Sequence, residues 1–314
     1  MSEERRLDLL VLGDCNPDLV LSDPELVPEF GQVERLVERA DLTIGGSGAI
    51  TACGASRLGL RTALAAVRGD DLFGRFMAEA LSERGVELDG LVVDPELQTG
   101  LTVILARNED RAILTFPGAI AELRCSMVDR ALLAQARHVH VSAFFLQRAL
   151  APGLEELLAS VKAGGATTSL DPNWDPSGEW DGGLAGLLPF IDVLLPNAAE
   201  VCAITGVDEP LDAARALAEA GPLVVVKMGQ QGAAAVRAGQ EVVSARAFEG
   251  QGMVDAIGAG DSFDAGFLAG WLDGWDLSRV LSLACACGTL SMRAAGGTGA
   301  QPTRAEADHQ AELL

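Results

Sequence analysis

Residues 254–267 read Val-Asp-Ala-Ile-Gly-Ala-Gly-Asp-Ser-Phe-Asp-Ala-Gly-Phe, and this stretch decides how the chain is expected to fold. Large apolar residues stand at positions 263, 267, 268, 271 and 272, a spacing that lines one face of a helix. A helix is therefore predicted to begin at about Asp261, just after Gly258 and Gly260. The two glycines let successive N–H groups point outward at the helix N-terminus, where the helix dipole favours an anion.

Asp261 has two interpretations. Aspartate is a favoured N-cap residue, so its carboxylate could simply close the first turn of the helix. A carboxylate beside an anion site can also take a proton from a nucleophile that attacks a transferring phosphoryl group. Asp261 can serve both as the N-cap and as the proton acceptor.

The wider string Asp-x-x-Gly-Ala-Gly-Asp-Ser-Phe-x-Ala-Gly-Phe closely resembles the C-terminal signature of the ribokinase-like (phosphofructokinase-B type) carbohydrate kinases. This resemblance implies an anion hole formed by the N–H groups of Gly258, Ala259 and Gly260, with Asp261 as the catalytic base. It also implies ATP as the phosphoryl donor and Mg²⁺ as cofactor. A monovalent cation such as K⁺ is expected, by the same resemblance, near Asp255.

The composition disfavours several classes of protein. The chain has 314 residues, 49% of them hydrophobic, which is enough to bury a large core. Its formal net charge of −22 disfavours nucleic-acid binding, which requires basic surfaces. No stretch approaches the ~20 apolar residues of a membrane span, and the charged start does not resemble a signal peptide. We therefore expect a cytoplasmic protein without nucleic-acid or membrane partners, whose six dispersed cysteines are free thiols.

Helix-like and strand-like segments alternate along much of the chain. Helices are expected at about 126–136, 152–163 and 180–188, and each precedes a strand, at 138–143, 167–170 and 192–195. This alternation predicts βαβ units and a mostly parallel central sheet with helices on both faces, in three layers. We expect one ribokinase-like domain over residues 1–314.

A small β-strand lid is expected in addition to this sheet. Residues 101–106 and 111–116 are strand-like runs around Asn108-Glu109-Asp110, which predicts a hairpin. In the family that the chain resembles, such strands cover the sugar, and here the lid would come from about 15–43 and 97–118. A lid excludes water that would otherwise accept the phosphoryl group. The resemblance also implies a homodimer that forms through the lid.

Polar residues follow the first predicted strand in the run Asp14-Cys15-Asn16-Pro17-Asp18. Ligands bind at the carboxyl ends of strands in open α/β sheets, although Asn-Pro and Asp are also ordinary turn residues. The resemblance extends to Gly45-Gly46 before a helix expected at 49–58, and to Asp171-Pro172-Asn173 after a strand. It implies that the acceptor is held by Asp14, Asn16, Asp18, Gly45, Gly46 and Asn173.

Two positions depart from the family pattern. Ile50 stands where the family commonly has Asn, so one expected polar contact is missing. Trp174 and Asp175 replace the usual continuation towards an Arg after Asn173. Without that Arg, an acceptor that already bears an acid or phosphate group is disfavoured. Both departures argue against ribose as the acceptor.

Two further segments are expected on the nucleotide side. Asn197 and Glu200 are three apart at a helix start, which is equally the pattern of a capping box and of the family's Mg²⁺ and phosphate motif. In the second interpretation Glu200 reaches Mg²⁺ through water. Lys227, Gly229 and Gly232 lie in a strand and Gly-x-x-Gly turn, which predicts a hairpin and, by resemblance, contact with ATP.

We therefore expect an ATP- and Mg²⁺-dependent kinase that phosphorylates a primary hydroxyl of a sugar or related polyol. One alternative is a nucleoside kinase of the same fold. The absence of tyrosine and the aromatic content of 4% favour sugars over nucleosides. Another alternative is a non-catalytic sugar- or nucleotide-binding homologue, against which the intact Asp261, Gly258 and Gly260 argue.

Overall fold

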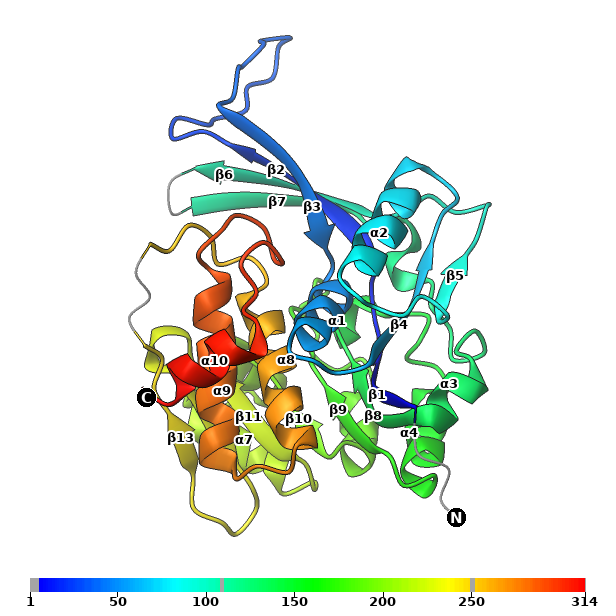
Figure 1. The fold of residues 1–314 in the computed structure, drawn as a ribbon, viewed down its shortest axis with the longest axis vertical. Helices are drawn as coiled ribbons and strands as arrows, with labels where there is room; N and C mark the ends of the chain where they lie inside the picture. Colours follow the sequence, from blue (N-terminus) through cyan, green and yellow to red (C-terminus); the bar gives the residue numbers. More distant parts are fainter. Residues whose placement is uncertain (1–5, 108–109, 249–251, 314) are drawn as a thin grey trace.

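The computed structural model describes residues 6–107, 110–248 and 252–313 and contains a nine-stranded central sheet (Figure 1). In spatial order its strands are β13 (Val243–Ala245), β12 (Ala233–Val236), β11 (Leu223–Lys227), β10 (Val193–Leu194), β9 (Thr167–Leu170), β8 (Ala136–Val141), β1 (Leu7–Leu12), β4 (Thr62–Arg68) and β5 (Leu91–Val93). The neighbours from β11 to β5 pair in parallel, and only β12 and β13 join antiparallel. The predicted mostly parallel sheet is confirmed.

Helices cover both faces of this sheet because its buried strands are apolar on both sides. In β1, for example, Leu10 and Leu12 pack into one core and Leu9 and Val11 into the other. The first core is shared with α3 (Arg130–Gln135), α4 (Leu154–Ala163), α5 (Leu184–Leu187), α6 (Ala198–Thr205) and α7 (Pro210–Ala218). The second is shared with α1 (Ser47–Arg57), α2 (Leu72–Glu83), α8 (Ala259–Leu272), α9 (Leu277–Ser291) and α10 (Arg304–Ala311).

The second sheet has four strands in the order β3 (Arg39–Gly45), β2 (Asn16–Ser22), β6 (Leu101–Arg107) and β7 (Asp110–Phe116). It extends away from the helical layers at the top of Figure 1. β6 and β7 pair antiparallel, as the predicted hairpin requires. Asn108 and Glu109, expected in its turn, lie outside the described residues. This sheet is the small lid expected from the sequence.

Several helices begin or end at residues other than those expected. α8 begins at Ala259 rather than Asp261, and α1 at Ser47 rather than Ala49. The helix expected at 180–188 is reduced to α5, because Trp180, Gly182 and Gly183 have positive φ angles that an α-helix does not accept. Within the described ranges, no helix is long and apolar enough to cross a membrane.

Candidate functional site

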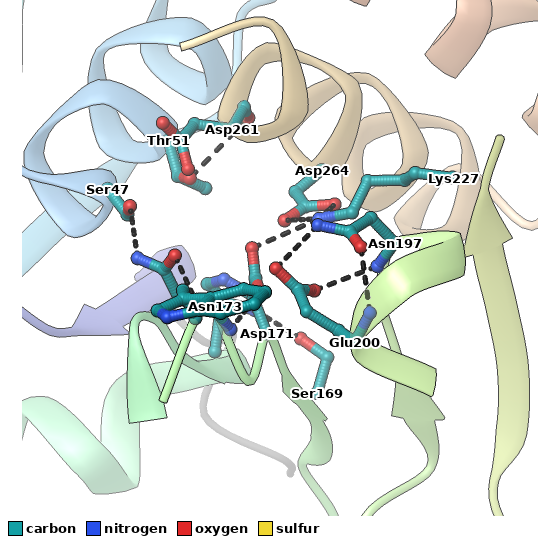
Figure 2. A network of polar contacts seen from close by, with 12 residues as sticks. Ser47, Thr51, Ser169, Asp171, Asn173, Asn197, Glu200, Lys227, Asp261 and Asp264 are labelled. Atoms are coloured by element: carbon teal, nitrogen blue, oxygen red, sulfur yellow. Dashed lines mark hydrogen bonds and ion pairs between the residues drawn. The ribbon is translucent and has the colours of Figure 1, made fainter. Parts of the chain in front are cut away.

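Figure 2 shows polar side chains that converge from the carboxyl edge of the sheet and from the starts of α1 and α8. Asp171 and Asn173 follow β9, Lys227 ends β11, and Asn197 precedes α6. Because parallel strands all end at the same edge, residues distant in sequence meet there.

The start of α8 is built around Gly258. Gly258 is the N-cap, has φ 68° and provides no side-chain cap. A Cβ atom at Gly258 would lie 2.6 Å from the Cα of Gly297. The close approach and the left-handed backbone both require glycine at position 258.

The structure corrects one interpretation of Asp261. It is the third residue of α8 and not its N-cap. Its side chain is therefore not needed to close the first helical turn. The backbone carbonyl of Asp261 accepts a hydrogen bond of 3.4 Å from Thr51 Oγ1, which ties α8 to α1. The carboxylate lies at the positive end of the helix, half-buried, beside the candidate anion hole.

Several neighbours act on the Asp261 carboxyl. Burial and the nearby Asp171 carboxylate raise the pKa of Asp261 well above its usual range. The Lys227 ammonium and a hydrogen bond from Ser47 oppose this rise. A carboxylate with a raised pKa is a better proton acceptor, which suits a general base.

Lys227 is held between two carboxylates. Its Nζ atom lies 3.1 Å from Asp171 Oδ2 and 3.1 Å from Asp264 Oδ2. The side chain of Asp264 is fully buried, and that of Lys227 is 12% exposed. Nζ also lies 3.7 Å from the position that a Cβ would take on Gly260, directly beneath the first turn of α8.

Asp171 and Asp264 respond differently to their surroundings although both contact Lys227. Burial opposes the ionisation of Asp171, but the Lys227 ammonium and a hydrogen bond with Asp264 outweigh it and lower its pKa. Burial raises the pKa of Asp264 well above its usual range, and Asp171 adds to the rise. Asp264 is thus a second buried acid in contact with Lys227. This role of Asp264 was not predicted, although one acid within the apolar run of α8 was a visible signal.

Asn197 and Glu200 form the predicted capping box. The Glu200 N–H donates to Asn197 Oδ1 over 2.9 Å, and the Asn197 N–H donates to Glu200 Oε2 over 2.8 Å. Burial and the Asp171 charge raise the pKa of Glu200 to about 7. No cluster of three or more His, Cys, Asp or Glu side chains among the described residues could hold a metal ion by itself. Mg²⁺ typically uses one or two carboxylates with water and phosphate, so Glu200 fits such a site.

On the acceptor side the Asp14 and Gly-Gly segments are in direct contact. Asp14 Oδ1 accepts a hydrogen bond of 2.7 Å from the Gly48 N–H. A Cβ on Gly45 would overlap the carboxylate of Asp18, and one on Gly46 would lie 2.9 Å from Asn16 Oδ1. These glycines are required because the carboxylates and the amide pack against bare backbone.

Asn16 carries an unsatisfied hydrogen-bond acceptor. Its Oδ1 is buried and has no partner among the described residues, while its Nδ2 donates to Thr102 Oγ1 of the lid over 3.3 Å. Burial and the Asp14 carboxylate raise the pKa of the adjacent Asp18 to about 7. A buried oxygen without a donor is costly unless a ligand supplies one, and hydroxyl groups are suitable donors.

Asn173 completes the acceptor side. It has φ 55°, a left-handed conformation that asparagine tolerates, and its Nδ2 donates to Ser47 Oγ over 3.2 Å. This bond joins the end of β9 to the start of α1, so the two motifs expected to hold the acceptor lie together.

Gly229 and Gly232 form the tight turn between β11 and β12, as predicted. Both have positive φ angles, 56° and 91°. The Met228 N–H donates to the Gly232 carbonyl over 2.8 Å, and a Cβ on Gly232 would overlap the Ala245 carbonyl. The hairpin accounts for both glycines structurally, and their contact with a nucleotide stays a prediction.

Asp255 lies in the loop before α8 and contacts the lid. Its carboxylate accepts from the Ile257 N–H (3.0 Å) and the Gly296 N–H (3.1 Å), and Arg111 Nη1 of β7 lies 3.7 Å from it. A monovalent cation here stays a prediction.

Ile50 is buried against two glycines, Gly258 at the start of α8 and Gly297 in the loop after α9. A Cβ on Gly258 would lie 3.0 Å from Ile50 Cγ2, and one on Gly297 would overlap Ile50 Cδ1. The isoleucine therefore supports the loop at the anion hole through apolar packing.

Comparisons with known proteins agree with one another. The model of the pfkB family carbohydrate kinase matches residues 6–304. Haemophilus influenzae ribokinase is 28% identical over 96% of this chain and 97% of its own length. Bacillus subtilis 2-dehydro-3-deoxygluconokinase is also 28% identical, over 83% of this chain and 84% of its own. A candidate ribokinase II from Escherichia coli, solved with ATP and Mg²⁺, superimposes with a TM-score of 0.86 at 24% identity, over 98% of this chain and 100% of that one. At that identity the superposition demonstrates the shared fold alone.

Proposed function

Because this chain belongs to the pfkB family of carbohydrate kinases, and is therefore a phosphotransferase, we propose that it transfers the γ-phosphoryl group of ATP to a primary hydroxyl of a sugar or related polyol. The position of Asp261 carries the proposal. Its carboxylate lies in the first turn of α8, beside the glycine N-cap. It has no capping role to explain it, and its raised pKa suits proton transfer.

In this mechanism Asp261 accepts the proton of the acceptor hydroxyl as its oxygen attacks the γ-phosphorus. The N–H groups of Gly258, Ala259 and Gly260 donate to the charge that develops on the transferring phosphoryl group. Asn197 and Glu200 would hold Mg²⁺, Glu200 through water, and the ion would supply positive charge against the phosphates. Lys227 lies beneath Gly260 and offsets the negative field of the surrounding carboxylates. Gly229 and Gly232 would contact the nucleotide from the β11–β12 turn.

The acceptor would lie against Asp14, Asn16 and Asp18, with its ring over the bare backbone of Gly45 and Gly46. The unpaired Asn16 Oδ1 supports this orientation, because a substrate hydroxyl can supply the missing donor. Asn173 would close the site from the end of β9. Ribokinase and 2-dehydro-3-deoxygluconokinase are equally identical to this chain, so sequence identity does not choose among acceptors.

The test is an ADP-release assay over sugars, polyols, sugar acids and nucleosides, in K⁺ and in Na⁺ salts. We expect Asp261→Asn to lower kcat by about 10²- to 10⁴-fold while ATP affinity is kept, because only proton transfer is lost. Asp273→Asn, at the end of the same helix, is the control and should retain activity. Near-normal turnover of Asp261→Asn would refute the assignment.

The same panel separates the alternatives. A response to nucleosides alone would indicate a nucleoside kinase of this fold. No response to any acceptor, with ATP binding intact, would indicate a non-catalytic binding protein. A rate that is equal in K⁺ and Na⁺ would remove the monovalent cation at Asp255 from the proposal.

We also propose that two copies associate through the lid. The exposed strand β7 supports this, because Ile113, Leu114 and Phe116 are 55%, 61% and 49% exposed. Apolar side chains gathered on one strand are typical of an interaction surface. Light scattering across a range of protein concentrations would detect the dimer, and a constant monomer mass would exclude it.

A further inference from the structure

Four aromatic rings form a continuous series beside the candidate acceptor site. Phe144 and Phe145 are 5.2 Å apart, Phe145 and Trp180 5.5 Å, and Trp180 and Trp174 4.9 Å, measured between ring centroids. The last two pairs meet edge to face, at 86° and 88°. Burial changes along the series, from Phe144 at 2% exposed to Trp174 at 59%. The buried Phe144 thus helps to fix the position of the exposed Trp174 through the two rings between them.

The backbone that carries Trp174 is fixed by Asp175. This buried carboxylate accepts from the Ser177 N–H (2.8 Å) and the Trp180 N–H (2.7 Å). Trp180 has φ 55°, a conformation that a bulky residue adopts only when its surroundings impose it. The loop thus holds Trp180 in edge-to-face contact with Trp174.

Trp174 stands next to the polar groups expected to bind the acceptor. Its backbone N–H donates to Asn173 Oδ1 over 2.7 Å, and the same Asn173 amide donates to Ser47 Oγ. The residue that carries the exposed indole therefore adjoins the point where the end of β9 and the start of α1 meet. Exposed tryptophan held rigidly by its neighbours binds flat apolar faces at low entropic cost.

The charge of the loop restricts which ligand can approach. Residues 171–180 contain the acids Asp171, Asp175 and Glu179 and no lysine or arginine. Lys227 is the one cation among the candidate site residues, all of which the structure describes, and two carboxylates hold it. Arg111 of the lid pairs with Asp255. Because Lys227 and Arg111 already pair with acids, an acceptor with its own carboxylate or phosphate would meet like charge without a free partner.

The structure assigns Trp174 as a stacking platform for the acceptor, which we infer to be an uncharged sugar in its ring form. The C–H face of the ring would lie on the indole while its hydroxyls bond to Asn16 and the neighbouring carboxylates. An open-chain polyol has no such face. A sugar acid or sugar phosphate has one but carries the wrong charge. This inference rests on the proposed function and specifies its acceptor.

The test uses matched acceptors and matched tryptophan variants. The pair ribose and ribitol differs in ring closure, and the pair glucose and glucuronate, which both form a ring, differs in charge, with fructose 6-phosphate and adenosine as further members. We expect Trp174→Ala to raise the acceptor KM by about 3- to 10-fold, with the KM for ATP and kcat little changed. Trp174→Phe keeps a ring and should restore most of the affinity. Trp275 lies outside the site, so Trp275→Phe should leave the acceptor KM unchanged.

Intrinsic fluorescence gives a second readout that does not depend on turnover. The chain has four tryptophans, and addition of the preferred ring sugar should change the emission of the wild type and of Trp275→Phe but not of Trp174→Phe. If the wild type phosphorylates sugars while Trp174→Ala keeps its acceptor KM, the platform is refuted and the proposed function stands. Preference for ribitol, glucuronate, fructose 6-phosphate or adenosine would also refute the inference. A wild type that phosphorylates nothing refutes the proposed function, and this inference with it.

Discussion

At the scale of single residues, Lys227 supplies the positive charge that offsets the buried carboxylates of the site. Its ammonium contacts Asp171 and Asp264, and further carboxylates from Glu200 and Asp261 act on it. These acids raise the pKa of Lys227 although burial opposes the rise. The lysine is thus charged at every physiological pH. Without it, the carboxylates that the mechanism requires would repel both one another and the phosphates of ATP.

We predict that Lys227→Met lowers the free energy of unfolding by about 3–5 kcal/mol, because it leaves buried carboxylates without their cation. Urea denaturation followed by circular dichroism measures this change. Lys162→Met is the matched control. Its ion pair with Asp192 is about one-third exposed on the lysine side and should contribute only ~0–1 kcal/mol.

A second substitution makes the test specific. Adding Asp264→Asn to Lys227→Met removes one of the two stranded carboxylates and should recover part of the lost stability. If the double variant is no more stable than Lys227→Met alone, the Lys227–Asp264 pair does not contribute in the way proposed.

At the scale of elements, the start of α8 depends on its contact with the chain near Gly297. The two backbones approach so closely that residue 258 must lack a Cβ, and Ile50 fills the remaining space. The helix N-terminus is in this way fixed against α1 and the C-terminal loop. An anion hole must be rigid to stabilise a transition state, because its donors cannot reorient during the reaction.

We predict that Gly258→Ala lowers kcat by at least about tenfold and the free energy of unfolding by about 1–3 kcal/mol, through the clash and the unfavourable φ together. Gly274→Ala is the control. It has φ 73°, close to the 68° of Gly258, but a Cβ there meets nothing within 4 Å. The control should therefore lose some stability and no activity. Equal kinetic effects of the two substitutions would contradict the role of Gly258.

At the scale of the whole molecule, the free energy of unfolding depends on pH through the buried acids of the candidate site and through the net negative charge of the chain. Burial raises the pKa of five acids at the candidate site, with Asp18 and Glu200 each reaching about 7: Asp14, Asp18, Glu200, Asp261 and Asp264. In the unfolded chain such groups titrate near pH ~4. Between these values the folded protein binds more protons at these acids than the unfolded one, so their contribution to stability falls as the pH rises. Burial lowers the pKa of His138 to about 3 and that of His140 to about 4, and these two groups offset part of that fall.

We predict that the free energy of unfolding decreases by at least ~1 kcal/mol from pH 5 to pH 8 at constant ionic strength. The net charge of −22 acts in the same direction, because self-repulsion grows as acids ionise. Glu200→Gln should make the pH dependence shallower, whereas Glu219→Gln, at an exposed position, should leave it unchanged. Thermal unfolding across this range measures both. An equal pH dependence of the wild type and Glu200→Gln would contradict the raised pKa of Glu200.

The sequence predicted the mostly parallel sheet from local patterns: the period of apolar residues and the alternation of helices and strands. Its resemblance to the carbohydrate kinase family supplied the lid and the candidate site residues. Local rules also predicted the Asn197–Glu200 capping box. These rules gave wrong starts for two helices. Asp261 lies inside α8 and is not its cap, and α5 begins well after Trp180.

Which of these residues contact one another depends on the tertiary structure. Asp264 and Lys227 are separated by 37 positions in the chain, and Asn173 and Ser47 by 126. The choice of these partners depends on the order of strands in the sheet and on the packing of α8 against α1, neither of which a local pattern contains. The sequence thus predicted the phosphoryl-transfer signature at residues 254–267. Folding set the protonation of its acids, because burial and distant charges determine pKa values.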